Sequence, residues 1–319
     1  MEEMVVDARG LSKRYGELRA VRDLNFSVNR GEMFCLVGPD GAGKTTTIKL
    51  LSGITRPSDG RARIFGFDLV EEAEKIKPRI GYLSQRFTLY GDLTVDENIE
   101  FFAGIHEVRN YGQRREELLG FTRLAAFRRR LAEHLSGGMK QKLALACTLI
   151  HTPDLLLLDE PTTGVDVVSR REFWKILSGL LERKLTILIT TPYMDEAERA
   201  GRVALMHRGA FAVVETPAKV KSLMRGEVVE VVCPELRRAA AAAKRVPEVV
   251  EVQMFGDRVH VVVMDADRDF PGVRSRLLEE GIDVSNWRRL SPSLENVFIS
   301  LTQTHPEGLT LDSRDGQHG

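Results

Sequence analysis

The feature that most constrains this chain is a glycine-rich segment between an apolar run and a helical pattern. Residues 38–45, Gly-Pro-Asp-Gly-Ala-Gly-Lys-Thr, fit the pattern G-x-x-x-x-G-K-[ST]. The preceding run Met33–Val37 is typical of a buried strand, and Lys44–Ser52 has the spacing of a helix that ends at Gly53. A strand, a glycine loop and a helix in this order predict a phosphate-binding loop.

The residue types of this loop suit phosphate chemistry. Glycines let backbone N–H groups surround phosphate oxygens, and the helix N-terminus adds partial positive charge. In such a loop Lys44 reaches the β- and γ-phosphates, and the Thr45 hydroxyl coordinates magnesium. The alternative is a glycine-rich turn that binds nothing, but the flanking strand and helix favour a nucleotide site. The predicted nucleotide-binding residues of the loop are Gly38, Pro39, Asp40, Gly41, Ala42, Gly43, Lys44, Thr45 and Thr46.

A second apolar run ends in two adjacent carboxylates. Leu155–Leu158 is followed directly by Asp159 and Glu160. Neighbouring side chains of a strand point in opposite directions, so the two carboxylates have separate roles. We expect Asp159 to hold the magnesium or its waters, and Glu160 to polarise a water for attack on the γ-phosphate. The alternative is a strand that simply ends in a charged loop.

Alternating strand and helix patterns predict an α/β core. The continuous apolar runs Leu155–Leu158 and Leu185–Thr190 are expected in strands buried on both faces of a parallel sheet. Between them, Val167–Lys184 has helical spacing, so strand, helix and strand follow one another. Residues 92–150 are mostly helical in pattern and rich in Arg and Glu, which predicts a helical subdomain at about 85–150.

The composition changes after residue 224. The later patterns predict the order β-α-β-β-α-β, which is the split, ferredoxin-like arrangement. Its expected elements are 227–233, 235–245, 249–255, 258–264, 269–280 and 282–290, with a last helix at 293–302. We therefore predict an α/β domain at 1–224, a small α+β accessory or dimerisation domain at 225–303, and a disordered polar tail at 304–319.

Charge and composition exclude several classes. Lys and Arg total 46, and Asp and Glu total 46. The chain therefore lacks the overall basic surplus that would indicate a nucleic-acid partner. No apolar run approaches the ~18 residues that a membrane helix needs. The acidic start Met1–Met4 has no signal-peptide pattern, so we expect a chain that is soluble by itself. Cys35, Cys147 and Cys233 lie far apart, which fits a reducing compartment rather than a disulfide scaffold.

A second glycine motif lies about 20 residues before Asp159. A helix start at Ser136, with the backbone of Gly137 and Gly138, would make another anion site, although Ser-Gly-Gly is also an ordinary helix entry. With this motif the sequence resembles the ATP-binding cassette (ABC) proteins, whose signature is LSGGQ. Here Met139 replaces the glutamine. The resemblance implies that the segment closes over the γ-phosphate held by a second cassette. The signature segment comprises Leu135, Ser136, Gly137, Gly138 and Met139.

Four further positions match or depart from the family pattern. Tyr15 corresponds to the aromatic residue that stacks on adenine, with a buried core tyrosine as the alternative. Gln85 corresponds to the loop glutamine that contacts magnesium. Asp166 corresponds to the loop that bridges two cassettes, and it is also a good helix N-cap. Pro192 stands where the family's switch histidine is expected, and proline has no side-chain donor for a γ-phosphate.

The cassette resemblance covers about residues 4–224, and Ser291–Phe298 resembles the terminal segment of daunorubicin-resistance-type exporter ATPases. It implies an α/β P-loop cassette with a mixed sheet and a helical subdomain. It further implies an ATPase that uses ATP and Mg²⁺ to drive export of drugs or small amphiphiles. The expected partners are a second cassette, identical or different, and a separate transmembrane permease that holds the chain on the cytoplasmic face of the membrane. No nucleic-acid partner is expected.

The stretch Gln85–Asn98 is expected to contact the permease. Phe87, Leu89, Tyr90 and Leu93 are apolar or aromatic residues in a polar context there, and the alternative is that they pack inside the subdomain. Two other functions stay open. One is a soluble ABC clamp acting on nucleic acid or ribosomes, and the other is a weakly hydrolysing nucleotide-binding regulator, which the missing switch histidine would explain.

Overall fold

The computed structural model describes residues 3–86, 89–284 and 286–304. The chain divides into two compact units, residues 1–214 and 215–319. This division precedes the boundary expected at residue 224, because helix α8 (Pro217–Lys221) contacts helix α11 (Leu294–Thr304) of the second unit. Among the described residues, no helix is long and apolar enough to cross a membrane.

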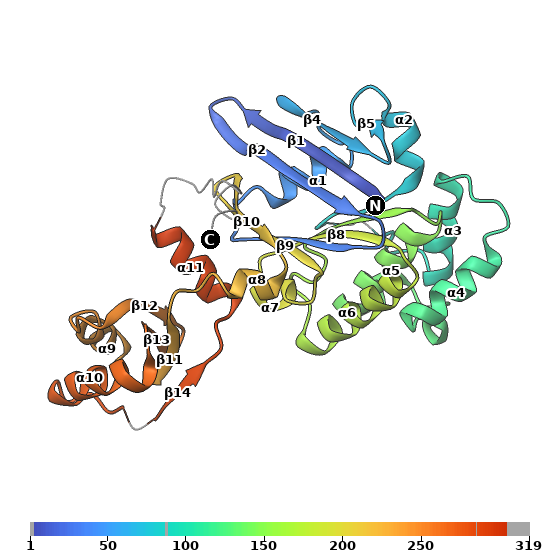
Figure 1. The fold of residues 1–319 in the computed structure, drawn as a ribbon. Helices are drawn as coiled ribbons and strands as arrows, with labels where there is room; N and C mark the ends of the chain where they lie inside the picture. Colours follow the sequence, from blue (N-terminus) through green and yellow to red (C-terminus); the bar gives the residue numbers. More distant parts are fainter. Residues whose placement is uncertain (1–2, 87–88, 285, 305–319) are drawn as a thin grey trace. The chain divides into compact units, whose positions relative to one another are not determined.

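A six-stranded sheet with the order β10-β9-β3-β8-β7-β6 forms the centre of the first unit (Figure 1). Its strands are β3 (Met33–Val37), β6 (Ile80–Leu83), β7 (Leu155–Asp159), β8 (Thr186–Thr191), β9 (Arg202–His207) and β10 (Ala210–Glu215). The strands from β9 to β6 in this order are parallel to their neighbours. Every residue of β3, β7 and β8 is buried, which confirms the three buried strands predicted from the apolar runs.

An antiparallel sheet with the order β2-β1-β4-β5 lies beside this centre. Its strands are β1 (Met4–Tyr15), β2 (Leu18–Asn29), β4 (Asp59–Ile64) and β5 (Phe67–Asp68). The sequence patterns did not predict this sheet. Its two long strands pair with several register shifts, which interrupt the alternation that would identify them.

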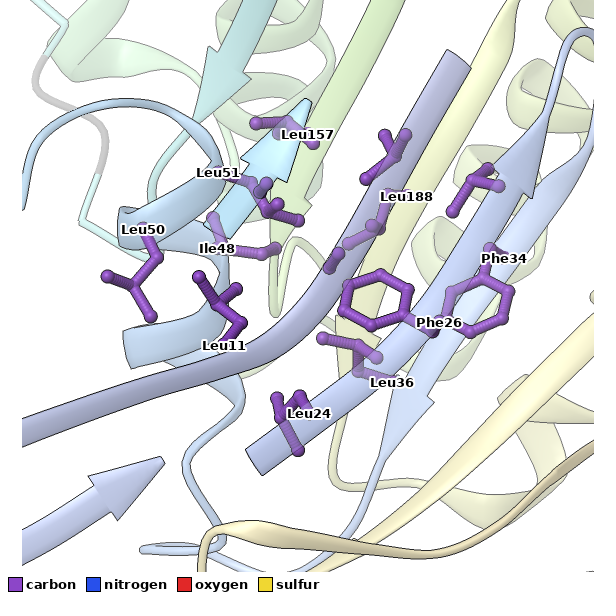
Figure 2. Packing of buried hydrophobic residues seen from close by; sticks show 14 of the residues in the cluster. Leu11, Leu24, Phe26, Phe34, Leu36, Ile48, Leu50, Leu51, Leu157 and Leu188 are labelled. Atoms are coloured by element: carbon purple, nitrogen blue, oxygen red, sulfur yellow. The ribbon is translucent and has the colours of Figure 1, made fainter. Parts of the chain in front are cut away.

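The core between the two sheets holds helix α1 (Lys44–Leu51) in place (Figure 2). Ile48, Leu50 and Leu51 of α1 are fully buried against the apolar side chains of both sheets. The rings of Phe26 and Phe34 stack with centroids 5.5 Å apart, which joins β2 to β3. Because α1 is fixed on this core, its N-terminus is fixed at the carboxyl end of β3.

Helices fill the segment predicted as a helical subdomain. They are α3 (Val95–Ile105), α4 (Gly112–Thr122) and α5 (Gly137–Leu149), with short 3₁₀ turns η2 (Ala125–Phe127) and η3 (Ala132–His134). Thr94 and Glu97 form a reciprocal capping box that starts α3. Helix α6 (Val167–Glu182) lies between β7 and β8 in the chain, where it was predicted. The remaining short elements are α2 (Ala73–Ile76), η1 (Lys77–Arg79) and α7 (Met194–Ala197).

The second unit has its own sheet, with the order β12-β13-β11-β14 and antiparallel pairing throughout. Its elements follow the predicted β-α-β-β-α-β order. They are β11 (Glu227–Val232), α9 (Leu236–Ala243), β12 (Val249–Phe255), β13 (Arg258–Val263), α10 (Ala266–Glu279) and β14 (Asn286–Leu290). Alanines of α9 and apolar residues of α10 pack on one face of the sheet. The tail expected to be disordered lies outside the described residues, apart from Thr304.

Candidate nucleotide-binding site

The phosphate loop, residues 38–45, connects β3 to α1 and has a backbone that only glycine permits at two places. A Cβ on Gly38 would lie 2.1 Å from the carbonyl oxygen of Met206. Gly43 has φ 105°, and a Cβ there would lie 2.5 Å from the carbonyl oxygen of Ala20. The loop therefore packs directly on neighbouring backbone, and its glycines keep the N-terminus of α1 open to an anion.

The Lys44 ammonium is buried and fully engaged in the loop. Its Nζ donates to the carbonyl oxygens of Gly38 (2.8 Å) and Pro39 (3.0 Å). It also lies 3.0 Å from Oε1 of Glu160, and both side chains are buried. A phosphate entering the loop must therefore draw Lys44 away from a carboxylate.

Asp159 ends β7 and accepts two hydroxyl hydrogen bonds at the same oxygen. Thr45 Oγ1 lies 3.0 Å and Thr190 Oγ1 lies 2.9 Å from Asp159 Oδ1. Burial raises the pKa of the Asp159 carboxyl despite these two hydrogen bonds. A hydroxyl and a carboxylate in contact are the oxygen ligands that Mg²⁺ prefers, so these side chains fit the expected metal.

Glu160 follows Asp159 and points its carboxylate into the same site. Gln85 Nε2, just beyond β6, donates to Glu160 Oε2 at 3.1 Å, and Thr163 Oγ1 donates to it at 3.3 Å. The backbone of Glu160 is left-handed, with φ 48°, and its N–H donates to Thr190 Oγ1 at 3.0 Å. In this structure Gln85 contacts Glu160, and its predicted contact with the metal stays a prediction.

Lys44, Thr45 and Glu160 line one cavity of about 800 Å³, and Asp159 lies behind Thr45, outside that lining. It includes most of the predicted phosphate loop together with Gln85, Glu160 and Pro192. It also includes residues for which the sequence analysis made no prediction: Leu18, Arg19, Ala20, Arg22, Thr163, Tyr193 and Arg208. The three arginines come from β2 and from the β9–β10 turn, and no local motif marks them. Their charge adds to that of Lys44 in a cavity suited to a polyphosphate.

Tyr15 lies at the end of β1 and is 48% exposed. Its ring is 5.1 Å from Lys13 Nζ. It is not a buried core residue, and it is outside the lining of the cavity. Adenine stacking on Tyr15 stays a prediction.

Pro192 lines the cavity at the carboxyl end of β8. A buried carboxylate, Glu196, holds the segment around it. Glu196 accepts from Thr191 Oγ1 at 2.6 Å and from Thr162 Oγ1 at 2.7 Å, which joins the ends of β8 and β7. Pro192 therefore lies where the switch residue is expected, but its side chain cannot donate or accept a hydrogen bond.

The signature segment lies outside this cavity. Ser136 is exposed and caps α5, with its Oγ 3.3 Å from the N–H of Met139. Asp166 is also exposed and caps α6, with Oδ1 3.0 Å from the N–H groups of Val168 and Ser169. The hydrogen bond from the Ser169 N–H is the main cause of the lowered pKa of Asp166, and the one from the Val168 N–H also lowers it. The N-cap role expected for Asp166 is confirmed.

Comparison with known proteins identifies the family. The sequence model of a family described as "ABC transporter" matches residues 21–163. A daunorubicin resistance ATP-binding protein of Streptomyces coeruleorubidus is 35% identical over 307 residues, which cover 95% of this chain and 97% of that relative. This chain belongs to the ABC transporter family. The match confirms the predicted resemblance to daunorubicin-resistance ATP-binding proteins.

Two further matches concern the cassette of this ABC protein. A probable multidrug ABC transporter ATP-binding protein of Escherichia coli (strain K12) is 43% identical over 225 residues, which is 69% of this chain but only 38% of that relative. The solved dimeric structure of a bacterial ABC transporter cassette has a TM-score of 0.60 and 26% identity, and covers 66% of this chain and 98% of that one. The ABC chain is therefore an ATP-binding subunit and an ATPase with the cassette fold.

Proposed function

We propose that this ABC subunit hydrolyses ATP between two cassettes and thereby drives a separate membrane permease of an exporter. One observation carries this proposal. Lys44, Asp159 and Glu160 meet at a single site, whereas Ser136 of the same chain lies outside the cavity. The chain thus has two half-sites, and a second cassette, identical or different, would complete each of them. The dimeric solved relative supports such an arrangement.

The roles of the side chains follow from their positions. Lys44 would leave Glu160 and the loop carbonyls to bind the β- and γ-phosphates, which frees Glu160 for the attacking water. Gln85 and Thr163 would hold the Glu160 carboxylate in orientation, because both already donate to Oε2. Thr45 and Asp159 would hold Mg²⁺, which supplies charge neutralisation at the phosphates when bound.

Completion of the site would come from the partner's signature segment. The exposed Ser136 hydroxyl and the N-terminus of α5, which it caps, would form an anion site at the surface. Two bound ATP molecules would attract two such helix ends, and loss of the γ-phosphate would weaken the attraction. Binding would therefore close the dimer and hydrolysis would reopen it.

The permease contact is proposed for the described part of the stretch 85–98. Tyr90 is 42% exposed, and its ring lies 4.4 Å from that of Phe101, which is itself 38% exposed. Phe87 lies outside the described residues. This aromatic pair, from the loop before α3 and from the helix itself, supports a surface for the permease on the cytoplasmic side of the membrane. Recovery of Tyr90→Ser with the co-expressed permease should fall relative to Tyr111→Ser, and equal recovery of the two variants would count against the contact.

The cargo is proposed from the named relatives. The Streptomyces relative is named for daunorubicin resistance and the Escherichia coli relative as a probable multidrug transporter subunit. We infer an exported drug or small amphiphile as cargo. Deleting the gene and plating on a panel of amphiphilic drugs should lower resistance to some of them, and restoring the gene with Lys44→Ala should not recover it.

Two variants test the chemistry. Lys44→Ala should lose most ATP affinity, because the phosphates lose their main buried cation. Glu160→Gln with ATP and magnesium should form a stable dimer on sizing, because the donors remain while the base is lost. Unchanged ATP titration in Lys44→Ala would contradict the site. A Glu160→Gln chain that stays monomeric, alone and with its permease, would contradict dimer closure.

The weakly hydrolysing regulator remains the second candidate, because Pro192 offers no donor at the switch position. Phosphate release by the wild-type subunit with its permease distinguishes the two. Steady turnover near ~1 s⁻¹, the low end for phosphoryl transfer, favours the exporter ATPase. Turnover several hundred times lower, even with permease present, favours the regulator.

A further inference from the structure

Thr190, near the end of β8, contacts both Asp159 and Glu160. Strand β8 lies between β3, which leads into the phosphate loop, and β7, which ends in Asp159. In the parallel pairing of the strands, Thr190 is opposite Asp159 on one side and opposite Leu36 on the other. Thr190 is fully buried and lies outside the lining of the nucleotide cavity. Its hydroxyl therefore reaches the two acidic residues from behind the cavity wall.

The partners of the Thr190 hydroxyl determine the direction of its two hydrogen bonds. Oγ1 lies 2.9 Å from Oδ1 of Asp159, and a carboxylate only accepts, so the hydroxyl proton points to Asp159. The amide nitrogen of Glu160 lies 3.0 Å from the same Oγ1, and a backbone N–H only donates. One hydroxyl therefore bridges the two neighbouring residues, as a donor to Asp159 and as an acceptor from Glu160.

At Asp159 the bridge uses an oxygen that Thr45 also uses. Thr45 Oγ1 donates to the same Oδ1 at 3.0 Å. In the proposed function Thr45 turns its oxygen to Mg²⁺, so this hydrogen bond would be lost when the metal binds. The Thr190 hydroxyl would then keep the Asp159 carboxylate in its orientation toward the metal, as hydrogen-bond partners of metal-binding side chains do.

At Glu160 the same threonine holds a strained backbone. Glu160 has φ 48°, in the left-handed region that residues with a Cβ seldom adopt. Its N–H is shared between Thr190 Oγ1 at 3.0 Å and the carbonyl oxygen of Thr190 at 3.2 Å. A conformation of this kind persists only where the surrounding contacts determine it. Thr190 therefore supports the backbone turn that brings Glu160 to the cavity.

We propose that Thr190 is a positioning residue for the ATPase reaction, which holds the metal-side carboxylate of Asp159 and the backbone of Glu160 in one fixed relation. This role rests on the proposed functions of Asp159 and Glu160. Pro192, two residues later, has no side-chain donor for a phosphate. In this cassette the end of β8 therefore supports the reaction from behind the two carboxylates, through Thr190, while residue 192 offers no donor in the cavity.

Calorimetric titration with a non-hydrolysable ATP analogue, with magnesium and with EDTA, tests this role without hydrolysis. The chain is kept below the concentration at which the wild type dimerises. Thr190→Val keeps the shape of the side chain but removes both the donor and the acceptor. The gain in affinity from magnesium should be about tenfold smaller than in the wild type, because partners of metal-binding side chains contribute roughly 10–100-fold to metal affinity. Affinity in EDTA should stay within about twofold, since Lys44 keeps its contacts.

Two further variants show whether the hydroxyl itself is responsible. Thr190→Ser retains the donor and the acceptor, so it should restore the magnesium gain to within about threefold of the wild type. Thr186 provides the matched control, because it is buried in the same strand and its Oγ1 accepts from the N–H of Gly31 at 3.0 Å. Thr186→Val should lower stability, as Thr190→Val does, but should leave the magnesium gain unchanged.

The outcomes separate this role from the proposed function. A folded Thr190→Val chain with the magnesium gain of the wild type would overturn the positioning role, and so would an equal loss in Thr186→Val. A wild type whose affinity does not respond to magnesium would contradict the proposed metal site of Thr45 and Asp159, and with it the role of Thr190. Thr190→Ala replaces Thr190→Val if the valine variant does not fold, with the same expected results.

Discussion

The contact between Lys44 and Glu160 predicts that removing the Glu160 carboxylate, the proposed catalytic base, will strengthen nucleotide binding. In the structure the two side chains are 3.0 Å apart and are 3% and 6% exposed. A nucleotide must break this pair before Lys44 can reach its β-phosphate. Glu160→Gln keeps the length of the side chain but leaves only a neutral acceptor, so Lys44 is released at lower cost.

The size of the effect follows from the kind of hydrogen bond lost. A hydrogen bond to a charged group contributes about 1.5–3 kcal/mol and a neutral one about 1 kcal/mol. The difference of about 0.5–2 kcal/mol corresponds to roughly 2–30-fold tighter binding. Asp40 provides the matched control, because its Oδ1 is 4.0 Å from the same Nζ but its side chain is 94% exposed. Asp40→Asn should change affinity by no more than about twofold.

Calorimetric titration with ADP isolates this effect. ADP carries the β-phosphate that draws Lys44 away, but it supports neither hydrolysis nor γ-phosphate-dependent closure. The Glu160→Gln chain should bind ADP more tightly than the wild type, and Asp40→Asn should match the wild type. An ADP affinity that is unchanged or weaker in Glu160→Gln would refute the reasoning that Glu160 holds Lys44 in competition with phosphate.

Three further predictions concern other residues of the cassette. Gly138→Ala should lower the free energy of unfolding by about 2 kcal/mol, because the new methyl group would overlap Ser169. Gly137→Ala is the control, because a Cβ there would meet nothing within 4 Å. Equal denaturation midpoints for the two variants would contradict the close approach of α5 and α6. Burial raises the pKa of Asp159, so the folded chain binds this proton more firmly than the unfolded chain and loses stability as pH rises through the folded pKa. Asp159→Asn should therefore raise the Tm of the nucleotide-free chain at pH 8, which corresponds to about 1 kcal/mol of stability, and the gain should shrink as the pH is lowered toward the ordinary pKa of an aspartate. Pro192→His should raise the rate of phosphate release about tenfold, because histidine would add a hydrogen-bond donor near the γ-phosphate. An unchanged rate would show that the side chain at residue 192 does not limit hydrolysis.

Local patterns predicted the parts of the site that a continuous segment encodes. The phosphate loop, the acidic end of β7 and the signature segment each lie in one short stretch, with a strand or helix start that restricts the geometry. The buried strands of the parallel sheet were predicted for the same reason, since a run buried on both faces is visibly apolar. The predicted bounds of the helices and strands in the second unit lie close to the observed ones, because glycines and alternating apolar and polar residues mark the ends of these elements.

Contacts between distant segments could not be predicted in this way. Arg22 and Arg208 join the nucleotide cavity because the backbone of β2 meets the β9–β10 turn, where Arg22 N donates to Gly209 O at 2.7 Å. Glu196 lies four residues after the switch position, Pro192, but its burial among threonine hydroxyls depends on the ends of two strands meeting. The division after Val214 depends on the packing of the short helix α8 against α11, a contact between distant parts of the sequence.

Three charged groups of the site are held in surroundings or conformations that are individually unfavourable, and this has a functional consequence. Asp159 is held in a place that disfavours its charge, Glu160 has a left-handed backbone that costs about 1 kcal/mol, and the Lys44 ammonium is held by its own loop and by the Glu160 carboxylate. In the proposed function, a magnesium-bound triphosphate would give Asp159 a metal partner and Lys44 a phosphate partner. Binding would therefore stabilise the fold of the cassette, by an amount that grows with the ratio of ligand concentration to Kd. Loss of the γ-phosphate would remove part of this stabilisation, and the proposed dimer would open as it is lost.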